Sequence, residues 1–298
     1  MIRKINICSN LKTGSEALLG VRVDFNNNIG FGHIKRIINF LDLVENKKKV
    51  IFFSNYQSNY FNKIKINKNY LFFKLKEEKN YNLDFINCKK IIEKNNFYFD
   101  LFIIDNYKIN NQWQKKINIY AKKTMIINDF IKKKFSCNYY INNNYGSDKL
   151  INKNKNKFFG NDYFIFPKNF NYNLKRKSID YKINTFGIKR TQILIHFGNY
   201  NKINIYKNIF TSLNKLNLKI NLIIINSDEK IIKKISDMKF INIRFKIIKF
   251  TNNLINYYIK SHIVIGAGGV SMMERIFFNI PSFIVQIANN QKIAIKNL

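Results

Sequence analysis

The segment LLGVRVDFNNNIGFGHIKRIINFL, residues 18–41, decides the fold class of this chain. Its first part, Leu18–Asp24, is a short apolar run typical of a buried strand, and the polar segment Asn27–Gly32 predicts a turn. After the turn, apolar residues recur at helical spacing and predict one buried stripe, formed by Ile34, Ile37, Ile38 and Leu41. A strand, a turn and a helix in this order are typical of a parallel sheet that is covered by helices.

The same alternation continues along both halves of the chain. In the first half, apolar runs predict further strands at Val50–Phe53, Tyr70–Leu75, Leu101–Asp105, Met125–Asp129 and Tyr139–Ile141. In the second half, they predict strands at Gln192–Gly198, Ile220–Asn226, Phe245–Phe250, His262–Gly266 and Ser282–Ala288, with a helical stripe of Tyr206, Ile209, Phe210 and Leu213 after the first. Two such series predict an α/β protein made of two Rossmann-like doubly wound domains that face a cleft.

A polar stretch, Asn171–Lys189, separates the two series of strands. We therefore expect an N-terminal domain over residues 1–170 and a C-terminal domain over residues 171–298. In doubly wound sheets, ligands bind outside the carboxyl ends of the strands. The loops that follow the predicted strands are therefore where functional residues are expected.

The composition argues against several classes of protein. With 298 residues, of which 46% are hydrophobic, the chain can bury a core, which disordered and fibrous proteins cannot do. Its 3 cysteines, Cys8, Cys88 and Cys137, are too widely separated to indicate a disulfide framework or a zinc site. No apolar run approaches the roughly 20 residues of a membrane helix, and the first residues lack the pattern of a signal peptide. We expect a soluble cytoplasmic protein without membrane insertion.

The formal net charge of +34 comes from 52 Lys+Arg against 18 Asp+Glu. Such an excess is often found in proteins that bind nucleic acid. Here the basic residues are mostly lysines spread along the chain, whereas proteins that contact phosphates and grooves tend to cluster arginine on one element. We expect a solvated basic surface, some nonspecific binding of polyanions and no specific nucleic-acid partner. A polyanion-binding protein is the alternative, and it would show strong salt dependence.

The sequence Gly30-Phe31-Gly32-His33 lies between the first predicted strand and the first predicted helix. Its glycines permit a tight turn and a close approach of the backbone to a ligand. His33 falls at the start of the helix, where the helix dipole disfavours the protonated ring. A neutral imidazole there could accept a proton from water. The alternative is a histidine that caps the helix or packs against it.

A second glycine-rich turn, Gly266-Ala267-Gly268-Gly269, also leads from a predicted strand into a predicted helix. Backbone N–H groups at a helix N-terminus, unobstructed by side chains at Gly268 and Gly269, are suited to bind a diphosphate. Ser271 adds a hydroxyl, and Glu274 can accept two hydrogen bonds from the vicinal hydroxyls of a ribose. The turn and the carboxylate together predict a nucleoside diphosphate site.

Other polar residues follow predicted strands. Ala288-Asn289-Asn290-Gln291 offers amides that suit sugar hydroxyls and acetamido groups, with an ordinary polar loop as the alternative. Asp105, Tyr107 and Asp129 follow two strands of the first half, where turn-capping is the alternative role. The sequence has no Asp-x-Asp pair and no Gly-Lys-Ser/Thr phosphate loop. We therefore expect a metal-independent site without a cofactor.

These residues resemble a known family, the UDP-2,4-diacetamido-2,4,6-trideoxy-β-L-altropyranose hydrolases of pseudaminic acid biosynthesis, which take part in flagellin glycosylation. The similarity extends from about Gly20 to Gln291 and is carried by short motifs in the family's order. These motifs are Arg22-Val23-Asp24, Ile29 to His33 with Arg36, Ile103 to Tyr107, Asn128-Asp129, Asn144 to Gly146, Phe197-Gly198, Gly266 to Gly269 with Glu274-Arg275, and Pro281 with Asn290-Gln291.

The resemblance implies a glycosyltransferase-B fold and an inverting hydrolase that releases UDP from a UDP-sugar. It also implies the roles of individual residues. His33 would be the catalytic base that activates water. The sugar side of the site would contain Arg22, Asp24, Gly32, Tyr107, Asn290 and Gln291. The UDP side would contain Gly198, Gly268, Gly269, Ser271 and Glu274.

The chain departs from the family pattern in the second half. Asn199-Tyr200-Asn201 follows Gly198 where the family has a second glycine and an aspartate, and Val270 and Met273 replace a Ser/Thr and a Trp. Family members usually continue through a further helix and strand after Gln291, so we expect a short C-terminal domain. Two alternatives follow for the function: a glycosyltransferase of the same fold that uses a UDP-sugar donor, or a degenerate protein that binds nucleotide sugars without turnover.

Overall fold

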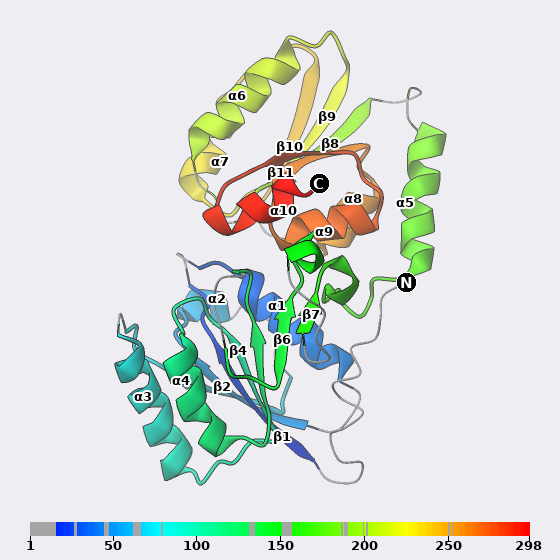
Figure 1. The fold of residues 1–298 in the computed structure, drawn as a ribbon. Coiled ribbons are helices and arrows are strands. Elements are labelled where there is room, and N and C mark those ends of the chain that lie inside the picture. The colour runs from blue at the N-terminus through cyan, green and yellow to red at the C-terminus, as the bar shows by residue number, and fades with distance from the viewer. Residues whose placement is uncertain are drawn as a thin grey trace. The chain divides into compact units, whose positions relative to one another are not determined.

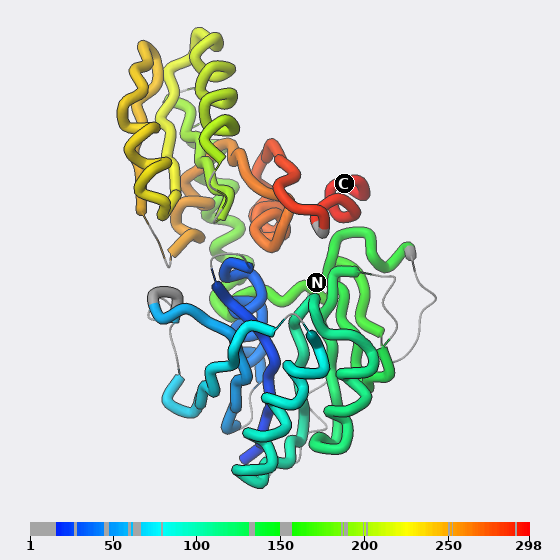
Figure 2. The backbone as a smooth tube through the Cα atoms, turned by 90° about the vertical axis from the view of Figure 1, so that its left-hand side faces the viewer, coloured from blue at the N-terminus to red at the C-terminus, as the bar shows by residue number. Residues whose placement is uncertain are grey.

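The computed structural model describes residues 16–26, 29–44, 48–61, 67–78, 80–130, 135–150, 157–185, 187, 190–198, 200, 202–249, 251 and 253–298. The chain divides into two compact units, and we describe each by itself. Unit 1 comprises Met1–Lys168 with Asn297–Leu298, and unit 2 comprises Asn169–Lys296. In Figure 2 the colour passes from blue to green through unit 1 and from green to red through unit 2, because the two units follow one another along the chain.

Unit 1 is built on a seven-stranded sheet with the order β3-β2-β1-β4-β5-β6-β7 (Figure 1). All of its strand pairs are parallel. The strands are β1 (Ala17–Val23), β2 (Lys48–Ser54), β3 (Tyr70–Lys74), β4 (Leu101–Asp105), β5 (Thr124–Ile127), β6 (Tyr139–Asn142) and β7 (Lys157–Phe159). The helices are α1 (Gly32–Leu43), α2 (Ser58–Phe61), α3 (Tyr81–Lys94) and α4 (Asn111–Ile117), with short 3-10 turns η1 (Asn118–Tyr120), η2 (Ser147–Leu150) and η3 (Asn161–Tyr163).

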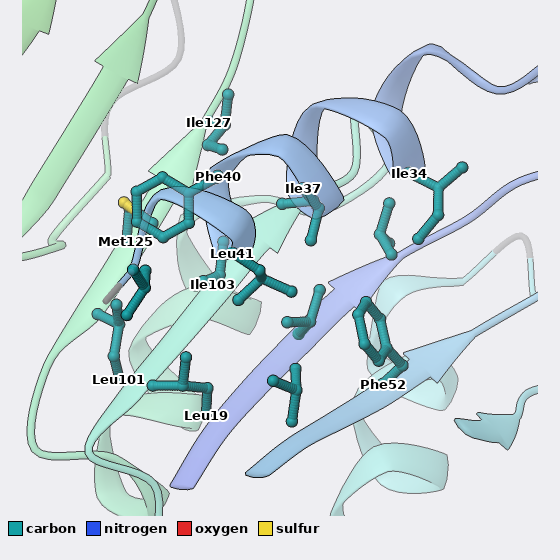
Figure 3. Packing of buried hydrophobic residues seen from close by; sticks show 14 of the residues in the cluster. Leu19, Ile34, Ile37, Phe40, Leu41, Phe52, Leu101, Ile103, Met125 and Ile127 are labelled. Atoms are coloured by element: carbon teal, nitrogen blue, oxygen red, sulfur yellow. The ribbon is translucent and has the colours of Figure 1, made fainter. Parts of the chain in front are cut away.

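Both faces of this sheet are buried. Side chains alternate between the faces along each strand, and each face packs into its own apolar cluster. In β4, Leu101 and Ile103 pack toward α1, whereas Phe102 and Ile104 pack with residues of α3 and α4 on the other face. Figure 3 shows the first face, where the apolar stripe of α1 lies over β1, β4 and β5. The stripe consists of Ile34, Ile37, Phe40 and Leu41, all nearly inaccessible to solvent. Ile38, which we expected in the stripe in place of Phe40, is only partly buried. Burial on both faces explains why these strands appear in the sequence as continuous apolar runs.

Unit 2 has a five-stranded sheet with the order β10-β9-β8-β11-β12, again entirely parallel. The strands are β8 (Thr191–His196), β9 (Ile220–Ile225), β10 (Ile243–Ile248), β11 (Ile263–Ala267) and β12 (Ser282–Val285). The helices are α5 (Tyr172–Thr185), α6 (Ile203–Asn214), α7 (Glu229–Ser236), α8 (Leu254–Ile259), α9 (Val270–Phe277) and α10 (Lys292–Lys296), with the 3-10 turn η4 (Asn289–Gln291). Residues Tyr206, Phe210 and Leu213 of α6 are buried against the sheet, as their spacing predicts.

The expected strands are confirmed, and α5 and β7 are among the elements that were missed. The polar stretch that we expected to separate the domains contains a 14-residue helix, α5, in which Ser178 and Thr185 are the buried positions. Most of the other positions of α5 are solvated and polar, so the helix has only a weak apolar periodicity. The sequence pattern therefore did not predict it. The short edge strand β7 was also missed, because three residues carry too little pattern to be distinguished from a loop.

Each sheet has one point where the strand order reverses. In unit 1, β1 pairs with both β2 and β4, and the helices after β1 and β4 cover opposite faces. In unit 2, β8 pairs with both β9 and β11. Ligands of doubly wound sheets bind at this topological switch point, outside the carboxyl ends of the strands. Within the described ranges, every helix is too short or too polar to span a bilayer.

Candidate active site

His33 and Asp105 meet at the switch point of unit 1. Asp105 is the last residue of β4 and is in register with Val23, the last residue of β1. The turn after β1 contains Gly30, whose φ of 76° favours glycine, and α1 then begins at the exposed Gly32. His33 is therefore the second residue of α1, as the sequence predicts. Residues 27 and 28 of the expected turn lie outside the described residues.

The imidazole of His33 is held by the carboxylate of Asp105. Nδ1 of His33 lies 2.6 Å from Oδ1 of Asp105, and the His33 side chain is 13% exposed while the Asp105 side chain is fully buried. Burial alone would raise the pKa of Asp105, but the charges and hydrogen bonds of Arg36 and His33 outweigh it and lower the pKa to about 2. An ionised carboxylate only accepts hydrogen bonds, so Nδ1 of His33 carries the proton and donates it. In the neutral ring this leaves Nε2 as a proton acceptor.

Arg36 fixes the carboxylate that holds His33. It lies one turn further along α1, and its guanidinium donates from Nε to Oδ2 of Asp105 at 3.0 Å and from Nη2 to Oδ1 at 2.7 Å. The same guanidinium donates from Nη1 to Oδ1 of Asp129 at 2.9 Å and, less closely, to Asn143. Arg36 is buried, and one cation thus orients two carboxylates. The sequence motif contained Arg36, but no pattern in it indicated this bridging role.

Tyr107 completes the cluster. Its hydroxyl donates to Oδ2 of Asp129, and its ring meets the ring of His33 edge to face, with centroids 4.6 Å apart. Burial, and then the charge of Asp129, raise the pKa of Tyr107. Tyr107 therefore remains a neutral hydroxyl, and its ring limits the positions that the imidazole of His33 can adopt.

The stability of unit 1 should depend on pH through Asp105. Because the pKa of Asp105 falls from its ordinary 3.8 to about 2 on folding, its contribution is complete above about pH 5 and is lost as the pH falls toward 2. The full shift corresponds to about 2 kcal/mol, of which about 1 kcal/mol should be lost between about pH 6 and pH 3. Urea unfolding of the wild type and of Asp105→Asn at both pH values measures it. A stability difference that is the same at pH 6 and pH 3 would contradict this prediction.

Arg22 and Asp24, which we expected near the sugar, belong to a second buried ion-pair cluster at the end of β1. Arg22 is 2% exposed and pairs with Asp24 and with Asp84 of α3, where Nη2 of Arg22 lies 2.5 Å from Oδ2 of Asp84. Trp113 donates from Nε1 to Asp84 at 2.9 Å, and Asn106 donates to Asp24 at 2.7 Å. Contact of Arg22 or Asp24 with a substrate would compete with these bonds, so we assign them a supporting role. The sequence did not indicate Asp84, which lies 62 residues from Arg22.

In unit 2, the predicted glycine-rich turn lies between β11 and α9. Gly269 is the N-cap residue of α9, and no side chain caps this end of the helix. A Cβ atom at Gly268 would lie 2.4 Å from Cδ1 of Ile295, so the turn packs closely against α10. Gly198 follows the neighbouring strand β8 at a φ of 63° and is exposed. Its neighbour Asn199, at the start of the altered family motif, lies outside the described residues.

The remaining predicted residues of unit 2 belong to α9 and to η4. Ser271, in the first turn of α9, accepts a hydrogen bond from Arg275 at 3.2 Å. Glu274 is half-buried beside Tyr258, whose pKa is raised first by burial and then by the charge of Glu274. Gln291 is buried, and its Oε1 accepts from the backbone of Ile287 at 3.0 Å. A Cβ atom at Gly269 would lie 3.5 Å from Nε2 of Gln291.

The structure thus brings the expected residues together in two sets. His33 and Tyr107 form one set with Asp105 at the switch point of unit 1. In unit 2, Ser271 lies in the first turn of the helix that follows Gly268 and Gly269, and Gln291 approaches the same turn. The backbone of Asn290 belongs to η4, and its side chain lies outside what the structure describes.

No family model and no curated protein sequence matches the chain. Solved structures do match it. MurG of Acinetobacter baumannii has 10% sequence identity and a TM-score of 0.65, over 95% of this chain and 83% of that chain. Arabidopsis thaliana UGT89C1 complexed with UDP has 7% identity and a TM-score of 0.59, over 95% and 83%. UDP-GlcNAc 2-epimerase of Neisseria meningitidis bound to UDP-GlcNAc has 12% identity and a TM-score of 0.54, over 94% and 85%.

At identities of 7–12%, these structural matches show the fold alone. The chain has two parallel-sheet α/β units in the arrangement of strands found in glycosyltransferase-B proteins, which confirms the expected fold class.

Proposed function

We propose that this protein hydrolyses a UDP-activated diacetamido-trideoxy sugar at its anomeric carbon, to give the free sugar and UDP with inversion of configuration. The reaction would belong to pseudaminic acid biosynthesis in the cytoplasm, as the sequence resemblance implies. The observation that carries the proposal is the hydrogen bond between His33 and the buried, ionised Asp105. It leaves Nε2 of His33 as the proton acceptor that activation of water requires.

In the proposed mechanism, Nε2 of His33 takes a proton from a water molecule as the water oxygen attacks the anomeric carbon. The bond between that carbon and the diphosphate oxygen breaks, and UDP leaves with the electron pair. Attack from the face opposite UDP inverts the anomeric configuration. Asp105 stabilises the imidazolium that forms, and Arg36 keeps Asp105 ionised and oriented.

Unit 2 would bind the UDP part of the substrate. The backbone N–H groups at Gly268 and Gly269, with the hydroxyl of Ser271, would bind the diphosphate, and Glu274 would bind the ribose. Gly198 would let the loop after β8 approach the nucleotide. Tyr107, Asn290 and Gln291 would contact the sugar. Two of the structural neighbours carry UDP or UDP-GlcNAc, which supports a nucleotide sugar as the ligand class.

The test is product analysis by NMR with purified protein and a panel of UDP-sugars, without any acceptor. We expect release of UDP and of a free sugar whose anomeric configuration is inverted at early times. Boiled protein is the control for spontaneous hydrolysis. Retention of configuration, or a donor that stays intact with every sugar tested, would contradict the hydrolase.

A glycosyltransferase is the second candidate, because MurG and UGT89C1 share this fold. In that case an acceptor hydroxyl would replace water, and His33 would deprotonate the acceptor. A transferase should leave the donor intact until an acceptor is added. The acceptor-free assay therefore separates the two reactions.

A further inference from the structure

The buried side chain of Arg275 packs against the glycine-rich turn of unit 2. It is 1% exposed, and its guanidinium donates from Nη2 to the carbonyl oxygen of Ala267 at 2.8 Å and from Nη1 to Oγ of Ser271 at 3.2 Å. Gly266 provides the room that this side chain needs. A Cβ atom at Gly266 would lie 2.8 Å from Nη1 of Arg275 and 2.8 Å from the carbonyl oxygen of His196. The guanidinium therefore fixes the shape of the turn from the buried side.

Among the described residues, Arg22 and Arg36 are the other deeply buried arginines, and their charges are better compensated than that of Arg275. Arg22 and Arg36 are each paired with two carboxylates. Arg275 forms no ion pair with a carboxylate in the described part of the chain; its guanidinium donates to two uncharged oxygens and interacts with the neutral hydroxyl of Tyr258. Its Nε has no hydrogen-bond partner among the described residues.

The electrostatic surroundings agree with this geometry. Burial lowers the pKa of Arg275, and the opposing influence of Tyr258 and Glu274 does not offset it. A guanidinium nevertheless remains protonated in proteins, so a positive charge stays under the turn. A buried cation without a paired carboxylate is costly, and an anion placed nearby reduces that cost.

We propose that Arg275 is a positioning residue for an anionic ligand at this turn, and that it selects a diphosphate over an uncharged nucleoside. The inference rests on the nucleotide site proposed above and adds the origin of its charge selectivity. Arg275 binds the carbonyl of Ala267, while no side chain caps the N-terminus of α9, so its first backbone N–H groups would be available to an anion. Because Oγ of Ser271 accepts from Arg275, its own O–H proton is directed to another acceptor, such as a phosphate oxygen.

Calorimetric titration of the full chain with UDP, UMP and uridine tests the inference. In the wild type, we expect affinity to rise from uridine to UMP to UDP. In Arg275→Met, UDP affinity should fall at least about tenfold, while uridine affinity should change less than about twofold, so the preference for UDP is reduced. Arg244→Met is the matched control, because Arg244 is an exposed arginine on β10 of the same unit.

Arg275→Lys is the second variant, and it is used if Arg275→Met does not fold. Lysine keeps the positive charge but loses the planar guanidinium, so the preference of this variant for UDP should lie between those of the wild type and Arg275→Met. If Arg275→Met does not fold, the preference of Arg275→Lys for UDP should still be lower than that of the wild type. Equal weakening of UDP and uridine would mean that Arg275 only maintains the fold, and this would overturn the inference. Unchanged UDP affinity in both variants would also overturn it. A wild type that does not bind UDP would instead contradict the proposed function.

Discussion

Replacing His33 with leucine should reduce the rate of UDP release by about 100-fold to 10,000-fold, the usual contribution of a general base. Leucine cannot accept a proton, but its size allows it to occupy the space beside Tyr107. Asp105 keeps its hydrogen bonds from Arg36 in the variant, so the cluster around it should persist. UDP affinity should change by less than about twofold, because the proposed UDP-binding residues belong to unit 2.

The matched control is Lys35→Leu, an exposed position on the same helix. It removes a polar residue of α1 without touching the cluster, and its rate should equal that of the wild type. The measurement is UDP released per unit time at saturating substrate, together with calorimetric UDP binding. A His33→Leu enzyme that retains wild-type turnover would eliminate His33 as the base.

Replacing Arg22 with methionine should lower the free energy of unfolding of unit 1 by about 3–5 kcal/mol. Methionine has a similar length, but it leaves the buried carboxylates of Asp24 and Asp84 without their shared cation. The single tryptophan, Trp113, donates to Asp84 and is fully buried, so its fluorescence reports on this cluster during urea unfolding.

Lys89→Met is the control for this prediction, because Lys89 lies on α3 of the same unit. Its side chain is 45% exposed and approaches Glu93 only at 3.6 Å, so the free energy of unfolding should change by less than about 0.5 kcal/mol. If Arg22→Met unfolded at the same urea concentration as Lys89→Met, the cluster would contribute little to stability.

Much of the fold could be predicted because local pattern and burial agree. The run Leu101–Asp105 was predicted with the bounds that the structure has, since both of its faces are apolar and an acidic residue ends it. The helix after β1 was predictable from the spacing of its apolar stripe. By contrast, α5 was missed, because only two of its positions are buried and its sequence is dominated by polar residues.

The candidate site could be predicted only in part. His33 and the glycine-rich turn were recognisable, because each follows a strand and begins a helix. The partners of the arginines were not recognisable. Arg36 reaches Asp129 across 93 positions of sequence, and whether an arginine near a strand end contacts a ligand or a buried carboxylate depends on the tertiary structure. For the same reason Arg22 was expected to contact the sugar, whereas the structure pairs it with two buried carboxylates.

The strand order also constrains how the chain can fold. In a sheet that contains only parallel pairs, no two neighbouring strands can be joined by a tight hairpin. The central strand β1 pairs with β4 from Leu19 opposite Leu101 onward, so its second edge is completed only after some 80 further residues are available. During synthesis, the segment that carries His33 would therefore emerge from the ribosome well before Asp105 could join it. We expect the histidine and its carboxylate partner to be assembled late, as one of the slow steps in the formation of unit 1.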